Sequence, residues 1–289
     1  MHQKPLFTIL IILALASVAC GIQINLPKSD VKTGPTTTEE IVVPRPDSSE
    51  QVTDLTLAFG AGTLKINPGA TEALVNGTAT YNVADFKPEI KIEGDNILIE
   101  QGDLNLSGFP SFDENIKNEW DFMLSEDPLD LTIKAGAYVG RYELGGLSLK
   151  QLEISDGASD VSLSFSEPNR IEMDTLRYNT GASSITLEKL ANANFSQMIF
   201  RSGAGSYRLD FSGELQREAN VDIESGISSL VIIIPVDVNA EVTVTGGMSN
   251  VQTSESWKQS GDTYTQTGDG PQLKITIQMG AGNLELRGR

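Results

Sequence analysis

The stretch LEISDGASDVSL, residues 152–163, holds the pattern that decides the fold. Apolar residues alternate with polar ones on both sides of a turn that begins at Gly157. Because successive side chains of a β-strand point to opposite faces, this alternation predicts two half-buried strand segments joined at a tight turn. Units of this kind recur along the chain. Their eight turns begin at Gly60, Gly136, Gly157, Gly181, Gly203, Gly226, Gly247 and Gly280.

The spacing of these turns is nearly constant in the middle of the chain. From Gly136 to Gly247 the steps are 21, 24, 22, 23 and 21 residues, whereas the first step spans 76 and the last 33. A repeat of this length indicates stacked coils. We therefore predict an all-β fold, a parallel β-helix or β-solenoid with coils of about 22 residues. An antiparallel β-sandwich built from hairpins is the alternative.

The turn residues suggest how each corner is made. Glycine permits a positive φ and therefore a tight corner. The residue after it is usually small, and we expect it to fit inside the narrow coil.

Composition divides the chain into four segments. Residues 1–19, with Lys4 before a short apolar run, are typical of a lipoprotein signal peptide. Residues 20–52 are rich in proline, threonine and charge, which predicts a flexible linker. Residues 53–117 contain most of the irregular first step, and we predict that they form a β cap with the first coils. Residues 118–289 contain the regular solenoid repeats.

Cys20 is the only cysteine of the chain, and it stands at the expected cleavage point. The stretch SVACG, residues 17–21, resembles a bacterial lipobox, whose cysteine is acylated. We therefore predict a lipid on Cys20 that anchors the chain to the cell membrane or an outer membrane, on the extracytoplasmic face. Ordinary cleavage that leaves a free thiol is the alternative.

Composition also excludes several classes of function. The one histidine, His2, leaves with the signal peptide, which excludes a Ser-His-Asp or Cys-His site and a histidine-containing zinc site. The net charge of −18 becomes −19 without Lys4, and such an acidic chain repels nucleic acid. We therefore expect that the protein is not an enzyme and that it binds no cofactor, metal ion or nucleic acid.

Most of residues 53–289 resembles a known family. The resemblance is carried by LAFGAGTL (57–64), ATYNV (79–83), KPE (87–89), NEWD (118–121) and PLDL (128–131). These stretches are similar to the bacterial toast-rack domains, which overlap with adhesin repeat domains. The resemblance implies a β-repeat fold at the cell envelope and no established catalytic residue. Some members resemble proteins that sense cell-wall stress.

Carboxylates are the remaining candidates for chemistry. Paired carboxylates about 5–10 Å apart would permit glycosidase chemistry. The acids expected to be exposed are Glu153, Asp156, Asp160, Asp174, Glu188, Asp210, Asp222 and Glu224. A ladder of exposed acids is also the ordinary surface of an acidic solenoid, and this interpretation is favoured.

Two loops contain further candidates for binding. Glu126, Asp127 and Asp130 offer the oxygen ligands that Ca²⁺ prefers, although their spacing matches no EF-hand loop and a solvated loop is favoured. Trp257 and Tyr264 lie in a polar insert and would contact a ligand if they were exposed. The alternative for Trp257 is that it folds back over the final coil.

Three functional hypotheses follow. The favoured one is an envelope-anchored, non-catalytic, adhesin-like lipoprotein that binds an envelope protein or a glycan. The second is an accessory or sensory component of a cell-envelope stress response. The third is a carboxylate-dependent polysaccharide-degrading enzyme.

Overall fold

The computed structural model describes residues 28–29, 31–46, 48, 51–102, 109–110, 115–247 and 250–289. These residues are almost entirely β-structure with two short 3-10 helices, and none of their helices is long and apolar enough to cross a membrane. The all-β prediction is confirmed. The elements are β1 (Lys28–Ser29), β2 (Thr37–Val43), β3 (Thr53–Pro68), β4 (Val75–Tyr81), η1 (Ala84–Phe86), β5 (Pro88–Glu93), β6 (Asn96–Gln101), β7 (Phe109–Pro110), β8 (Asn118–Leu124), β9 (Pro128–Glu143), β10 (Ser148–Ser164), β11 (Met173–Glu188), η2 (Leu190–Ala193), β12 (Phe195–Asp210), β13 (Ala219–Ile234), β14 (Asn239–Gly246), β15 (Asn250–Thr253), β16 (Lys258–Ser260), β17 (Thr263–Gln266) and β18 (Gln272–Gly288).

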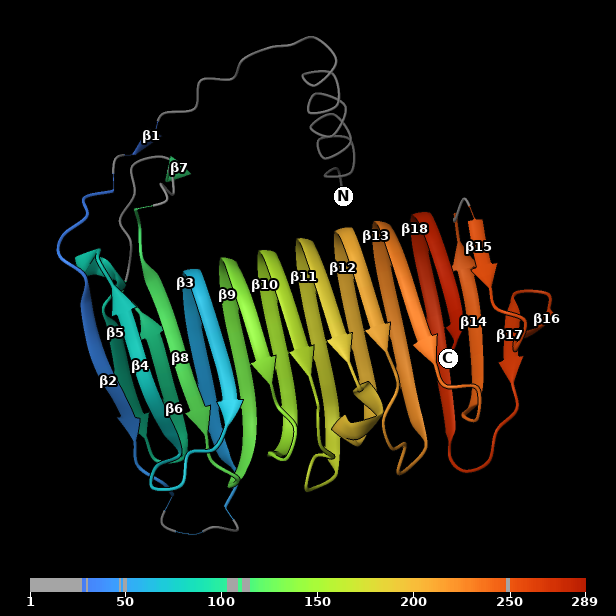
Figure 1. Cartoon of the computed structure of the whole chain (residues 1–289), viewed down its shortest axis with the longest axis horizontal. Coiled ribbons are helices and arrows are strands. Elements are labelled where there is room, and N and C mark those ends of the chain that lie inside the picture. The colour runs from blue at the N-terminus through green and yellow to red at the C-terminus, as the bar shows by residue number, and fades with distance from the viewer. Residues whose placement is uncertain are drawn as a thin grey trace, which may run out of the picture.

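The long strands β3, β9, β10, β11, β12, β13 and β18 form one parallel stack along the long axis of the molecule (Figure 1). Each has 16 or 17 residues and bends over near its middle, so its two halves form opposite faces of one folded sheet. Side chains from both halves, such as Leu152 and Leu163, are buried between the faces. The structure therefore confirms the parallel solenoid and not the hairpin sandwich.

The glycines at the bends lie opposite one another, but for a different reason from the one predicted. The first glycine of each bend, such as Gly181, does not have a positive φ. A Cβ atom on Gly181 would lie 2.4 Å from the carbonyl oxygen of Gly157 in the adjacent strand. Glycine is required here because the backbones approach too closely for any side chain. Positive φ occurs instead two residues later, for example at Gly62.

The small residue after each glycine also differs from its predicted place. Ala137, Ala158, Ala182 and Ala204 are exposed, not interior. Together with the glycines before them they form the outer ridge of the folded sheet, which is the upper edge of the stack in Figure 1. The third residue of the turn points inward because the alternation shifts by one residue at the bend: Ser225 and Ser228 are both buried, and two outward residues lie between them.

Strand order at the C-terminal end differs from the order of the repeats in the sequence. β18 pairs with β13 on one side and with β14 and β15 on the other. After β13 the chain therefore passes over one position to form β14 and β15. It continues outward through β16 and β17, which lie beyond β14, and returns as β18 to fill the gap (Figure 1). Gly280, not Gly247, lies next to Gly226, and residues 248–249 of the Gly247 turn lie outside the described residues.

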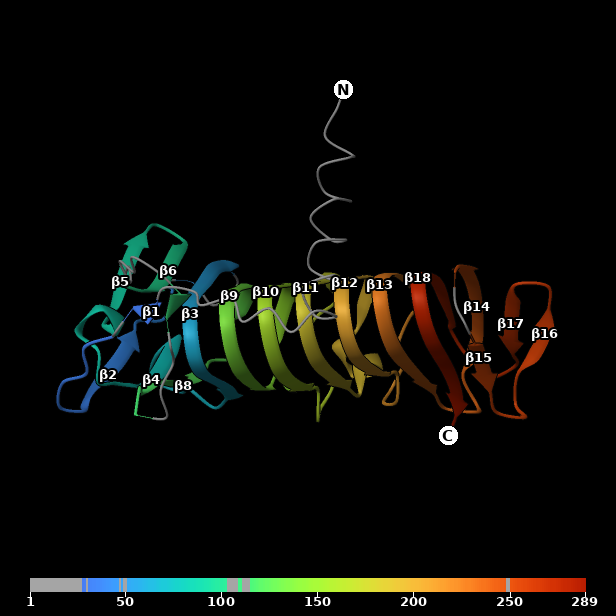
Figure 2. The ribbon, with the colours of Figure 1, turned by 90° about the horizontal axis from the view of Figure 1, so that it is seen from above.

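The N-terminal end divides the folded sheet into two leaves. The first half of β3 pairs with β6, which pairs in turn with β5, and we call β6 and β5 the first leaf. The second half of β3 pairs with β8, followed by β4 and β2, which form the second leaf. Figure 2 shows the two leaves diverging from β3. Of these strands, β4, β5, β6 and β8 come from the 76-residue step between Gly60 and Gly136, and β2 precedes it.

The predicted flexible linker, residues 20–52, is wrong for its middle part. β2 pairs with β4 along its whole length, and Ile41 and Val43 are buried in the core. The apolar run around Val42 is too short to form a core by itself. One apolar face of β2 is nevertheless enough, because β4 supplies its backbone hydrogen-bond partners and the other strands of the second leaf supply the rest of the core.

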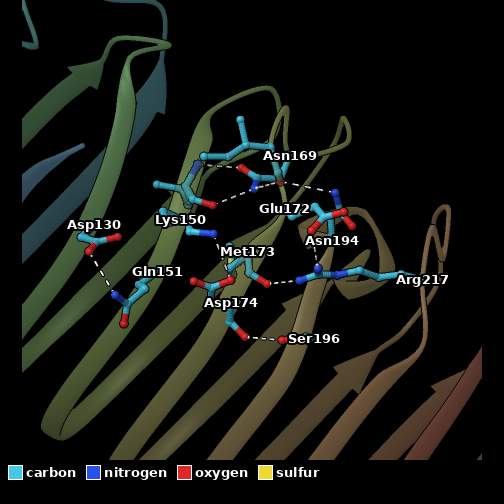
Figure 3. A network of polar contacts seen from close by, with 12 residues as sticks. Asp130, Lys150, Gln151, Asn169, Glu172, Met173, Asp174, Asn194, Ser196 and Arg217 are labelled. Carbon is cyan, nitrogen blue, oxygen red and sulfur yellow. Dashed lines mark hydrogen bonds and ion pairs between the residues drawn. The ribbon is translucent and has the colours of Figure 1, made fainter. Parts of the chain in front are cut away.

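Buried asparagines close the connections between long strands (Figure 3). The Oδ1 atom of Asn169 accepts a hydrogen bond from the Leu149 N–H at 2.8 Å, and its Nδ2 donates to the Leu149 and Ile171 carbonyls at 2.8 and 2.7 Å. Asn194, one connection further, also donates to the Ile171 carbonyl. These side chains thereby give hydrogen-bond partners to the N–H and carbonyl groups of Leu149 and to the carbonyl of Ile171.

Candidate functional site

The predicted acids lie along ladders and do not converge. Six of the eight are exposed, and several are paired with a cation: Asp160 with Arg141 at 2.8 Å, Asp174 with Lys150 at 3.0 Å, and Glu224 with Arg201 at 3.5 Å. The prediction of exposure is wrong for Asp210, which is buried near Arg289. It is also wrong for Asp156, which lies half-buried at a bend.

Asp156 is the centre of a polar cluster inside the bends. Its Oδ2 atom accepts hydrogen bonds from the Tyr178 hydroxyl at 2.9 Å and the Tyr138 hydroxyl at 3.3 Å, and its Oδ1 accepts one from Thr180. Burial, reinforced by the Asp156 carboxylate, raises the pKa of Tyr178, so this tyrosine stays a donor. A carboxylate satisfied by three donors stabilises the bend and is not poised as a base.

The loop acids are used internally. Arg45 donates to both oxygens of Asp127, and the resulting ion pair, with a hydrogen bond from Ser125, lowers the pKa of that carboxyl. Glu126 pairs with Arg170 at 2.6 Å. Asp130 accepts a hydrogen bond from Gln151 at 3.0 Å (Figure 3). No group of three or more potential metal ligands occurs in the described part of the chain, so the Ca²⁺ interpretation gains no support.

The two predicted ligand-contact aromatics point into the protein. Trp257 is 8% exposed and Tyr264, in β17, is 7% exposed, and both belong to the main core cluster. Trp257 thus covers the last strands, as the alternative interpretation of it requires. Neither ring is available on an exposed loop. Cys20 lies outside the described residues.

The structure instead reveals a hollow on the ridge, beside the N-terminal leaves. Its volume is about 450 Å³. Ala61, Ala137 and Ala158 from three successive bends line it together with Ile116, Tyr138 and Val139. The lining is mostly apolar, and Asp160, held by Arg141, lies at its margin.

Asn118 adds a polar group to this hollow. Its Nδ2 donates to the Ala61 carbonyl at 2.6 Å and to Gln101 at 2.8 Å. The side chain is 4% exposed, and its Oδ1 atom has no hydrogen-bond partner within the described residues. An unpaired buried acceptor costs free energy.

Sequence analysis missed this hollow because its lining comes from four separate segments around residues 61, 117, 138 and 159. One signal was present. Turns elsewhere have glycine or serine at the inward third position, whereas the Gly136 turn has Tyr138. The Tyr138 side chain is one of those that line the hollow.

A parallel sheet folded along one ridge, with its bends stacked in register, defines a folded-sheet β-repeat protein. Residues 32–175 match the family model described as the N-terminal domain of toast_rack, DUF2154, and this part of the chain belongs to that family. The match confirms the toast-rack resemblance.

Several solved structures are similar to this chain, and the first of the three that follow shares its fold. A putative cell adhesion protein from Clostridium sporogenes has 22% identity and a TM-score of 0.50, and the match covers 88% of this chain and 100% of that one. A putative adhesin from Bacteroides fragilis has 7% identity and a TM-score of 0.34, with coverage of 90% and 99%. A putative lipid binding protein from Parabacteroides distasonis has 11% identity and a TM-score of 0.37, with coverage of 89% and 98%. No curated protein matches the sequence.

Proposed function

We propose that this protein is a non-catalytic, adhesin-like binding protein of the cell envelope, and that it binds its ligand in the ridge hollow. The observation that carries the proposal is an apolar lining next to the unpaired Oδ1 atom of Asn118. A sugar ring fits this chemistry, because it combines an apolar face with hydroxyl donors. The stacked coils on either side leave room for a glycan chain to continue along the ridge.

A catalytic role is less well supported. Glycosidase chemistry needs two carboxylates close together and facing one substrate. Several carboxylates of the ladders, such as those of Asp160 and Asp174, are instead held by arginine or lysine, and that of Asp156 by tyrosine and threonine hydroxyls.

The anchoring part of the proposal rests on the sequence. A lipid on Cys20 would hold the folded sheet on the extracytoplasmic face of a membrane. Mass spectrometry of the purified protein should find an acylated Cys20 at the mature N-terminus, whereas Cys20→Ser should release the protein from membranes. An unmodified cysteine would contradict the anchor and leave the binding proposal untouched.

The binding test uses a glycan array with a matched pair of ridge variants. Ala158→Trp fills the hollow, while Ala204→Trp changes an equally exposed ridge position outside it. We expect the full chain to bind a set of glycans, Ala158→Trp to weaken that binding about tenfold or more, and Ala204→Trp to leave it unchanged. Binding that survives Ala158→Trp, or no glycan bound at all, would contradict the proposal.

A further inference from the structure

The outer edge of the first leaf is an unpaired strand. Among the described residues β5 pairs with β6 alone, and its other edge is open. An open edge presents a row of backbone N–H and C=O groups to which another strand can add. Charged residues alternate along β5 in the sequence PEIKIE, residues 88–93.

This edge also exposes apolar side chains on the side that faces the core further along the sheet. Ile90 is 39% exposed and Ile92 is 50% exposed. Their partners on β6, Ile99 and Ile97, are buried. The core face of the sheet therefore continues outward onto β5, where the second leaf no longer covers it (Figure 2).

The hairpin fixes which backbone groups point outward. β5 and β6 are joined by the two-residue turn Gly94–Asp95, with Gly94 at a φ of 61°, so Glu93 and Asn96 form the hydrogen-bonded pair that closes the turn. Hydrogen-bonded and non-hydrogen-bonded residues alternate in antiparallel ladders. The N–H groups of Ile90 and Ile92 therefore point away from β6.

We propose that a second copy of this chain pairs with β5 antiparallel, about a two-fold axis at Ile90. In this register Ile90 lies opposite the partner's Ile90, and Glu89 lies opposite the partner's Lys91. The two Ile90 residues would then exchange backbone hydrogen bonds. Each Ile92 N–H would donate to the partner's Pro88 carbonyl. Only the return hydrogen bond at that pair is lost, because proline has no N–H.

Charge selects this register over its neighbours. A shift that places the axis at Lys91 brings Lys91 opposite the partner's Lys91 and Glu89 opposite the partner's Glu93. Like charges directly opposite one another destabilise a strand pair, whereas opposite charges stabilise it. Lys91 also forms an ion pair with Glu100 in its own copy, which places it between two carboxylates in the dimer.

Cysteine cross-linking tests the register in the full chain carrying Cys20→Ser. Ile90→Cys places the two sulfur-bearing residues in a hydrogen-bonded pair, about 5.5 Å apart between Cα atoms, within disulfide range. Ile92→Cys is the matched control, because it lies on the same face and is more exposed, yet the same position in the partner is roughly 14 Å away along the strand. We expect a disulfide dimer for Ile90→Cys alone. Cross-linking of both variants, or of neither, would overturn the proposal.

Sedimentation velocity of the same full chain tests the charge pairing. The unsubstituted surface should give a dimer. Lys91→Glu should give a monomer, because Glu89 then faces a carboxylate. Adding Glu89→Lys should restore the dimer, because the two charges are then exchanged. Residue 89 lies opposite Glu100 on β6, so Glu100 still has a cation beside it in the double variant. A dimer that persists in Lys91→Glu, or a double variant that stays monomeric, would refute this interface.

Discussion

The middle of the molecule and its two ends are built by opposite rules. In the middle, long strands repeat in parallel, their glycines stack, and the same inward positions carry the core in every coil. At both ends the sheet divides, with one neighbour for each half of the last long strand: β6 and β8 on β3, β14 and β15 on β18. Short antiparallel strands complete each end.

The difference follows from what each part must bury. A coil in the middle has a neighbour on both sides, so an identical unit satisfies it. A terminal coil would leave an open row of hydrogen-bonding groups. The strands that cover this row, β6 and β8 on β3 and β14 and β15 on β18, still run parallel to it. Antiparallel strands follow beyond them, where β5 pairs with β6, β4 with β8 and β17 with β14.

The largest effect is expected from truncating a side chain in the middle. Phe200 is fully buried, with ring contacts to Tyr178 at 5.7 Å and Tyr207 at 5.3 Å between centroids. Phe200→Ala should lower the free energy of unfolding by about 3–5 kcal/mol. Trp257→Ala, at the C-terminal end, should cost roughly 1–2 kcal/mol and increase hydrogen exchange only near β14 to β17, because end units open locally. Urea unfolding measures the free energy of unfolding of both variants, and hydrogen exchange shows where each one opens. If both variants lost the same free energy across the whole molecule, the distinction between middle and end would be wrong.

A smaller effect is expected from one added methyl group in the glycine stack. Gly181→Ala should destabilise the protein by roughly 2–3 kcal/mol, because the new Cβ would collide with the Gly157 carbonyl oxygen 2.4 Å away. Gly34→Ala is the control at the N-terminal end, where the nearest atom lies 3.8 Å from the new Cβ. Thermal unfolding should separate the two variants, and a neutral Gly181→Ala would show that the stack can widen freely.

The smallest effect concerns the ion pair that ties the N-terminal segment to the stack. Arg45 lowers the pKa of Asp127 from its ordinary value of 3.8, so the pair stabilises the protein above that value and the contribution is lost as the pH falls through the lowered pKa. Arg45→Met should therefore be less stable than the unsubstituted protein at about pH 6, by less than Gly181→Ala, and the gap should narrow as the pH falls below 3.8 and through the lowered pKa of Asp127. Arg287→Ala, which removes an exposed pair with Glu285, should change stability less. A gap independent of pH would show that Arg45 acts by packing alone.

Several features were missed because they depend on contacts between distant segments. β2 looked like linker because Ile41 and Val43 form only a brief apolar run, yet β4 and the core lie beside them. Tyr264 looked exposed because its surroundings in sequence are polar, whereas in space it lies against the core. The hydrogen bonds of Asn118 with Ala61 and Gln101 join residues 57 and 17 positions apart, so they are not visible in the sequence.

The sequence by itself determined the alternation of buried and exposed residues, the glycine-led bends and their parallel stacking, because these depend on local periodicity and on a repeat that each coil shares with the next. Only the tertiary structure decided that β18 lies inside β14, that the sheet divides at both ends, and that four segments meet at the ridge hollow. Those outcomes depend on which segments can pair with the open strand edges at each end. That is decided by the path of the chain in space and not by its local sequence.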